Sequence, residues 1–361
     1  MKRVFTYFGL SFFFAIFLLI ACRNDDDGTA NDLYDDTPYA IDYPFRYPVM
    51  NIPDDNQLTM QKISLGRKLF YDPIISLDSS MACASCHNPQ FNFTDNGNAL
   101  SINAIGGQTQ RISMPLINLG WMNKGFFWDG REQTLEGAVL DAIADEHHPN
   151  WITTFEKMRN SGRYKEHFAQ AFKDGALSEE NVSKALASFL RIMISKDTKL
   201  DQFFRGQYQF TELEAFGFDS LFNTERGDCF HCHGVYPFIT DNDFHNNGLQ
   251  DVADINQFPD KGKGGVTGIA TDNGKFKTPS LRNLAYSAPY MHDGRFETLD
   301  EVLDFYSEGI HQNPTTSTLM EFAFQGGVQM SEYDKQALKA FLLTMTDETF
   351  INNPAFSNPF E

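Results

Sequence analysis

The sequence predicts a mostly α-helical protein with two domains and long loops. Apolar residues recur with helical spacing in segments 178–196, 298–306 and 331–345, whereas the alternating pattern of strands is rare. Segments 95–107 and 251–274 are rich in Gly, Asn and Asp, which is typical of loops. A chain of 361 residues is long enough for two domains, each with its own core.

The first 21 residues have the pattern of a secretory signal, because basic residues precede an apolar run that ends in Leu-Ile-Ala. Cys22 then completes a motif that resembles the lipobox of bacterial lipoproteins. We expect Cys22 to anchor the protein by lipid in the cell envelope of a Gram-negative bacterium, facing the periplasm or the surface. Arg23 in place of an acidic residue favours the outer membrane. Residues 22–40 would form a flexible tether.

A single membrane-anchor helix is the alternative to a cleaved signal. The apolar run is about 18 residues long, which is the lower limit for crossing a bilayer.

The charge balance is strongly acidic, with a formal net charge of −19. Nucleic acid is therefore not an expected partner, because binding phosphates needs a basic surface. An acidic surface attracts basic partners, such as a small cationic redox protein. The alternative is that the charge only keeps the protein soluble.

Apart from Cys22, the cysteines form two pairs in the sequences CASCH and CFHCH. The residues concerned are Cys83, Cys86, His87, Cys229, Cys232 and His233. A c-type haem needs two thiols at this spacing for its thioether bonds and an adjacent histidine as an iron ligand. A four-cysteine zinc site or two redox-active cysteine pairs would leave both histidines without a role. The motifs therefore predict two covalently bound c-type haems.

Each motif follows a similar segment, which is GRKLF at 66–70 and GFDSLF at 217–222. This indicates a weak internal duplication of a small helical haem domain. We expect a first haem domain at 41–196 and a second at 197–335. Residues 336–361 are expected to form a C-terminal helix and tail that pack back on the first domain. The predicted fold is thus mostly α, with two cytochrome c-like haem domains.

The chain from about Leu65 to Met345 resembles the bacterial di-haem cytochrome c peroxidase superfamily, which includes the methylamine-utilisation di-haem enzyme branch. The resemblance is carried by LGRKLFYDPIIS (65–76), CASCHNPQFNFTD (83–95), FFWDGREQTLE (126–136), CFHCHG (229–234) and TPSLRNLAYSAPYMHDGRFETLDEVLDFY (278–306). In this family peroxide reacts at the N-terminal haem, and the C-terminal haem supplies electrons. The resemblance therefore implies reduction of hydrogen peroxide with electrons from a small cytochrome c or similar donor, and it allows a homodimer.

The resemblance also implies roles for particular residues. His87 would be the proximal ligand of the peroxidatic haem, and His233 that of the electron-transfer haem. Trp128 matches the tryptophan between the haems, with a core aromatic as the alternative. Family members place a histidine before the segment that begins at Ser113, but 96–115 contains none. We therefore expect the first iron to be open without reductive activation.

The position of the family's catalytic glutamate is ambiguous in this chain. A gapless match places His148 there, and a shift of two residues places Glu146 there. Either side chain can move a proton between the two peroxide oxygens. In the other interpretations, His147 or His148 ligates and blocks the iron, or both are solvated at a helix end.

The second iron takes a methionine ligand in most of the family, but the matching residue is Tyr306. A tyrosine there resembles the methylamine-utilisation branch, and a phenolate stabilises ferric iron. The alternatives are Met291, Met330 or a histidine, with Tyr306 in the core.

A calcium ion typically lies between the two domains of the family. Its matching ligands would be the backbone carbonyls of Ser287 and Pro289, with Ser113 in place of the usual asparagine.

Three functions fit this sequence. The first is a peroxidase that uses a small redox donor. The second is a peroxide-driven di-haem oxidase that modifies a protein or small-molecule substrate, which Tyr306 favours. The third is a non-enzymatic di-haem electron carrier, which would need His147 or His148 on the first iron.

Overall fold

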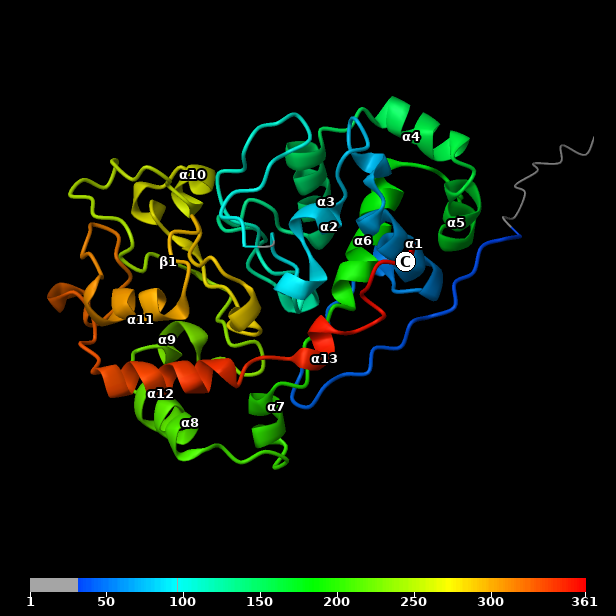
Figure 1. The fold of residues 1–361 in the computed structure, drawn as a ribbon. Helices are drawn as coiled ribbons and strands as arrows, with labels where there is room; N and C mark the ends of the chain where they lie inside the picture. The colour runs from blue at the N-terminus through cyan, green and yellow to red at the C-terminus, as the bar shows by residue number, and fades with distance from the viewer. Residues whose placement is uncertain (1–31, 96) are drawn as a thin grey trace, which may run out of the picture.

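The computed structural model describes residues 32–95 and 97–361. The predicted signal segment, Cys22 and the first part of the tether lie outside the described residues. No helix within the described ranges is long and apolar enough to cross a membrane. The fold is mostly helical, as predicted, and the chain forms two halves that lie side by side in Figure 1.

Thirteen α-helices and one two-stranded sheet are found in the described part of the chain. The α-helices are α1 (Met60–Tyr71), α2 (Cys83–Cys86), α3 (Leu135–Ala142), α4 (Trp151–Asn160), α5 (Tyr164–Ala171), α6 (Glu179–Arg191), α7 (Lys199–Phe204), α8 (Glu212–Phe216), α9 (Phe230–His233), α10 (Lys263–Thr267), α11 (Leu299–Glu308), α12 (Glu332–Leu343) and α13 (Glu348–Ile351). Strands β1 (Phe244–His245) and β2 (Phe276–Lys277) pair antiparallel. Two π-helical turns, η5 (Ile143–His147) and η6 (Gly217–Phe222), follow α3 and α8.

The three predicted helices are confirmed as α6, α11 and α12. Each begins after a hydroxyl N-cap, and the side chains of Ser178, Thr298 and Ser331 accept a hydrogen bond from the third residue of their helix. Helix α6 ends at Arg191, before the predicted end at 196. The loop predicted at 251–274 was wrong in part, because α10 lies inside it.

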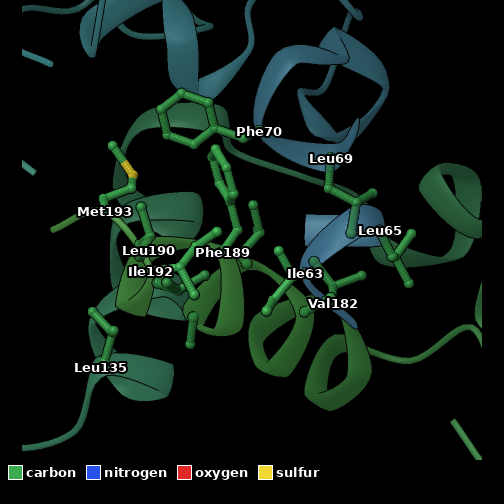
Figure 2. Close-up of a cluster of buried hydrophobic side chains, with 14 of the residues drawn as sticks. Ile63, Leu65, Leu69, Phe70, Leu135, Val182, Phe189, Leu190, Ile192 and Met193 are labelled. Atoms are coloured by element: carbon green, nitrogen blue, oxygen red, sulfur yellow. The ribbon is translucent and has the colours of Figure 1, made fainter. Parts of the chain in front are cut away.

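The first half is built around the packing of α1 against α6, with α3 and α5 at its sides. Its core contains aliphatic and aromatic side chains from these helices, several of which are shown in Figure 2. The second half is built in the same way, because α12 packs against α8 and η6, and α11 packs on α12. The apolar stripes expected from the sequence thus form two separate cores.

One glycine stands at the helix crossing of each half. A Cβ on Gly66 would lie 2.0 Å from the carbonyl oxygen of Ala185, and one on Gly217 would lie 2.2 Å from that of Ala337. Only glycine lets the two backbones approach this closely. The equivalence extends the short sequence similarity before the two haem motifs and confirms the internal duplication.

The predicted boundary between 335 and 336 is wrong, because it falls inside α12. Leu338 and Phe341 of this helix belong to the core of the second half. The tail after α12 crosses to the first half, where Phe350 and Phe356 join that core, and the C-terminus lies beside α1 in Figure 1. The helix stays with the second half because its apolar stripe packs on α8 and η6.

The tail is fastened where it leaves the second half. Asp347 is fully buried, and its carboxylate accepts hydrogen bonds from the backbone N–H groups of Lys196 and Asp197 at 2.6 and 3.0 Å. Its own N–H donates to Asn283 Oδ1 at 2.5 Å. One residue therefore ties the tail to the linker between the halves.

Candidate haem sites

The first Cys-x-x-Cys-His motif forms α2 and the residue that follows it. His87 Nδ1 lies 2.7 Å from the carbonyl oxygen of Phe93, which adopts the left-handed conformation with φ of 56°. A neutral ring donates from Nδ1 to this carbonyl, which leaves Nε2 as the metal-binding nitrogen. Burial lowers the pKa of His87, so the ring stays neutral as a ligand must.

The second motif repeats this arrangement at α9. His233 Nδ1 lies 3.2 Å from the carbonyl oxygen of Ile239, again six residues later, and Ile239 has a φ of 55°. Burial lowers the pKa of His233 to about 4. The two histidines are therefore held for the same task by the same local structure.

The four thiols are unpaired, and burial raises the pKa of each to about 12. Such thiols are poor nucleophiles, which disfavours two redox-active pairs. Cys83 lines one cavity, whereas Cys229 and Cys232 line another. A single four-cysteine zinc site is therefore wrong for this structure.

Each motif opens into a mostly apolar cavity, of about 460 Å³ in the first half and about 230 Å³ in the second. The first is lined by His87 and by apolar residues of α3 and α6, and the second by His233 and by apolar residues of α11 and α12. Thiols, a neutral imidazole and an apolar wall fit a covalently attached haem in both places.

Trp128 lines both cavities, as expected for a residue between two haems. Its Nε1 donates to the carbonyl oxygen of Ile112 at 2.9 Å, and the N–H of Ile112 donates to the carbonyl oxygen of His292 at 3.0 Å. Ile112 also lines both cavities. Trp128 is therefore part of the wall that separates the two sites and not a residue of either helical core.

The wall itself contains a second repeat, in which segment 126–142 matches segment 290–306. Phe126 bridges to Glu132, and Tyr290 bridges to Phe296 at the same separation. Between the two bridged residues lies a glycine with left-handed φ, which is Gly130 in the first segment and Gly294 in the second. A threonine then caps the following helix, α3 or α11. Trp128 thereby corresponds to His292, and Ala142 corresponds to Tyr306.

Tyr306 lines the second cavity from α11. Its hydroxyl accepts a hydrogen bond from Asn247 Nδ2 at 3.1 Å, and burial raises the pKa of Tyr306 to about 12. Met291 Sδ lies 3.6 Å from the same amide nitrogen. Met330 and His245 also line this cavity, so the geometry retains all the expected ligand candidates. At the equivalent place in the first cavity, Ala142 offers no ligand atom.

The π-helical turn η5 decides which acid–base candidate reaches the first cavity. Glu146 and His147 line the cavity, whereas His148 does not line it and adopts a left-handed φ of 45°. A π turn holds more residues than an α turn, so a gapless match of the sequence does not stay in register through it. Glu146 is therefore favoured over His148 by position.

Burial, with the nearby Asp145, raises the pKa of Glu146 to about 7. A carboxyl with this pKa can both accept and return a proton near neutral pH. Burial lowers the pKa of His147 to about 4, and only 3% of this residue is exposed. The interpretation of a solvated histidine pair is therefore wrong.

The expected calcium ligands lie together, because Ser113, Ser287 and Pro289 all line the second cavity. Ser113 Oγ is 3.0 Å from Ser101 Oγ, and Ser287 Oγ accepts from Asn92 Nδ2 at 2.9 Å. Calcium binding stays a prediction.

Some site residues gave no signal in the sequence. Lys277 is buried in the wall of the second cavity, where its Nζ donates to the carbonyl oxygen of Asn242 at 3.0 Å, and burial lowers its pKa to about 8. Arg111 joins the two halves by pairing with Asp129 at 2.6 Å and with Asp260 at 2.7 Å. Only tertiary structure brings these side chains to the haem cavities.

Two cavities that each begin at a Cys-x-x-Cys-His turn, with a tryptophan in their common wall, define a di-haem c-type cytochrome. Residues 60–209 match the family model described as di-haem cytochrome c peroxidase. The chain is 33% identical to the methylamine utilization protein MauG of Methylorubrum extorquens over 299 residues, which cover 82% of this chain and 81% of that protein. The chain belongs to the di-haem cytochrome c peroxidase family.

Two further comparisons agree. The chain is 32% identical to cytochrome c peroxidase Ccp of Escherichia coli over 260 residues, which cover 70% of this chain and 54% of that protein. A crystal structure described as a MauG-like protein associated with microbial copper homeostasis superposes with a TM-score of 0.81 at 32% identity, covering 90% of this chain and 100% of that chain. The relatives thus include both peroxidases and MauG-type proteins.

Proposed function

We propose that the protein reduces hydrogen peroxide to two waters with two electrons from a small cytochrome c or similar donor. The observation that carries this proposal is that the first cavity is lined both by Glu146, which can transfer a proton, and by Ala142, which cannot bind iron. Glu146 has a pKa of about 7 there, and Ala142 occupies the place of Tyr306. A cavity with a proton-transfer group and no second ligand from α3 is suited to a small substrate, and His147 of η5, which also lines it, stays the candidate for blocking the iron.

When bound, the haem of the first cavity supplies the iron at which peroxide is reduced. Glu146 takes the proton from one peroxide oxygen and returns it to the other, so that water leaves. The hydrogen bond from His87 to the carbonyl oxygen of Phe93 holds the imidazole ring in one orientation. The same bond makes the ring a stronger ligand for iron. Trp128 and Ile112 connect the two cavities and offer electrons a short path between them.

A second candidate is a peroxide-driven oxidase that modifies a protein or small-molecule substrate. Tyr306 in the second cavity favours it, because a phenolate ligand stabilises oxidised iron. The similarity to MauG and to a MauG-like structure supports the same interpretation.

The setting of the reaction is part of the proposal. An exported protein, anchored by lipid at Cys22, would meet peroxide and small cytochromes in the periplasm. The net charge of −19 would attract a basic donor. A calcium ion held by Ser113, Ser287 and Pro289 would stiffen the wall between the haems.

An optical titration tests the proposal. One equivalent of hydrogen peroxide is added to the oxidised protein with both haems attached, and the visible and near-infrared spectra are followed with and without reduced cytochrome c. An immediate change that reverses only as cytochrome c is oxidised supports the peroxidase. A long-lived oxidised species that does not react with reduced cytochrome c supports the oxidase. No reaction, together with no binding of cyanide or carbon monoxide, would leave the electron carrier.

A further inference from the structure

A group of oxidisable side chains lies outside both haem cavities. The Trp121 ring centroid is 5.1 Å from that of Tyr47 and 6.4 Å from that of Tyr43, both in edge-to-face contact. Met50 packs in the same cluster with Tyr47 and Trp121. Tryptophan, tyrosine and methionine are among the side chains that give up an electron most readily, and here they gather around Trp121.

The inner end of this cluster lies next to both haem sites. Trp121 ends a one-turn helix, and its neighbours Leu119 and Met122 line the first cavity. On another side, the Trp121 ring centroid is 5.5 Å from that of Phe238. Phe238 precedes Ile239, whose carbonyl holds the iron-ligand candidate His233. Trp121 is therefore connected through neighbouring residues to the first cavity and to the residue that holds His233.

The outer end of the cluster is Tyr43, which is 37% exposed. Its hydroxyl accepts a hydrogen bond from the N–H of Met50 at 3.2 Å, so its own proton can pass to water. Tyr47 differs, because it is buried and its hydroxyl donates to the carbonyl oxygen of Ser195 at 2.5 Å. A backbone carbonyl cannot take up the proton that an oxidised tyrosine releases. Only Tyr43 of the two can therefore form a neutral radical.

Two exposed apolar side chains follow Tyr43 within the next six residues of the chain. Phe45 is 45% exposed and Val49 is 82% exposed. An aromatic molecule can rest on such a surface. A phenol also exchanges one electron and one proton, which is what a tyrosyl radical requires.

We propose that Trp121 and Tyr43 carry oxidising equivalents from the haems to the surface, where Tyr43 oxidises a small phenol that does not enter either cavity. This inference rests on the proposed reaction with peroxide. Tyr43 gives one electron to Trp121 and one proton from its hydroxyl to water. Trp121 passes the electron inward, toward the site that peroxide has oxidised.

The phenol then returns one electron and one proton to Tyr43 and leaves as a phenoxyl radical. Two such cycles supply the two electrons that one peroxide needs. The net reaction converts one hydrogen peroxide and two phenols into two waters and two phenoxyl radicals, so atoms and electrons balance.

Spin trapping with the nitrone DMPO tests the route in the protein with both haems attached. Peroxide is added without any electron donor, and tryptic peptides are analysed by mass spectrometry. We expect a DMPO adduct on Tyr43. Trp121→Phe should remove this adduct although Tyr43 is still present, and Tyr43→Phe should abolish oxidation of guaiacol. The matched control is Tyr333→Phe, since Tyr333 is 55% exposed on α12 and outside the cluster.

The outcomes separate this inference from the proposed function. If peroxide is consumed and cytochrome c is oxidised, but Tyr43 carries no adduct, the route is wrong and the peroxidase stands. The route is also wrong if Tyr43→Phe oxidises guaiacol as fast as Tyr333→Phe. If the wild-type protein does not react with peroxide at all, the proposed function and the route fail together.

Discussion

Trp128 and His292 both hydrogen-bond to the backbone of Ile112, Trp128 to its carbonyl oxygen and His292 to its N–H group. Trp128 Nε1 donates to the carbonyl oxygen of Ile112, and the N–H of Ile112 donates to the carbonyl oxygen of His292. The two residues occupy equivalent positions in the repeat of segments 126–142 and 290–306. The two copies of the repeat thus both contact Ile112, which lines both cavities.

Replacing Trp128 should interrupt the path between the cavities. We expect Trp128→Phe to bind both haems but to slow the oxidation of cytochrome c by peroxide. Loss of its hydrogen bond leaves a buried carbonyl unsatisfied, at a cost of about 1–3 kcal/mol in the free energy of unfolding. Stopped-flow spectroscopy of the second haem measures the rate. The matched control is Trp151→Phe, which changes a ring that stacks on Phe155 in α4. Equal rates in the two variants would contradict the bridge.

Glu146 should control proton transfer in the first cavity. Its pKa of about 7 means that the carboxylate, which is the form that accepts a proton, gains population as pH rises through 7. We therefore expect kcat/KM for peroxide to rise over that range. Glu146→Gln should lower it by about 100- to 10,000-fold and remove the rise. His148→Asn is the comparison, because His148 does not line the cavity. A larger loss in His148→Asn would restore the gapless assignment.

The second ligand of the second haem can be identified by three substitutions. If Tyr306 binds the iron, Tyr306→Phe changes the visible and electron paramagnetic resonance spectra of that haem, whereas Met291→Leu and Met330→Leu leave them unaltered. Asn247→Ala should cause a smaller spectral change, because Asn247 Nδ2 donates to the Tyr306 hydroxyl. Unaltered spectra in Tyr306→Phe, with a change in either methionine variant, would show that a methionine is the ligand.

The two crossing glycines should be equally intolerant of a side chain. Gly66→Ala and Gly217→Ala would each place a Cβ against a backbone carbonyl, and overpacking of this kind costs about 1–3 kcal/mol or more. Denaturant unfolding measures the change in the free energy of unfolding. Gly265→Ala is the control, because its Cβ would meet an ordinary contact at 3.8 Å, and we expect a change below about 1 kcal/mol. An unchanged free energy of unfolding in Gly66→Ala would contradict this prediction, because it would mean that α1 and α6 can move apart to accept the methyl group.

The sequence predicted the parts of the molecule that depend on local patterns. Each haem motif is recognisable from only five residues. The helices that begin after Ser178, Thr298 and Ser331 are indicated by their caps and apolar stripes. The site could not be completed in this way. Glu146 reaches the cavity because η5 changes the helical register, which spacing does not reveal.

Other features depend on contacts between distant segments. Asn247 meets Tyr306 across 59 positions of the chain, and Arg111 meets Asp260 across 149. Helix α12 was assigned to the wrong half because an apolar stripe shows that a helix is buried but not which partner buries it. The tail beyond it was placed correctly against the first half.

The buried carboxylate of Asp347 sets a limit on what regulation this protein can have. It binds the tail to the linker at Lys196 and Asp197, while the tail itself is embedded in the first core. A hinge between the halves would have to break these bonds and expose Phe350 and Phe356. These contacts therefore oppose a change in the spacing of the two haem sites. We therefore expect turnover to be controlled by the supply of electrons and peroxide and by the ligands of each iron.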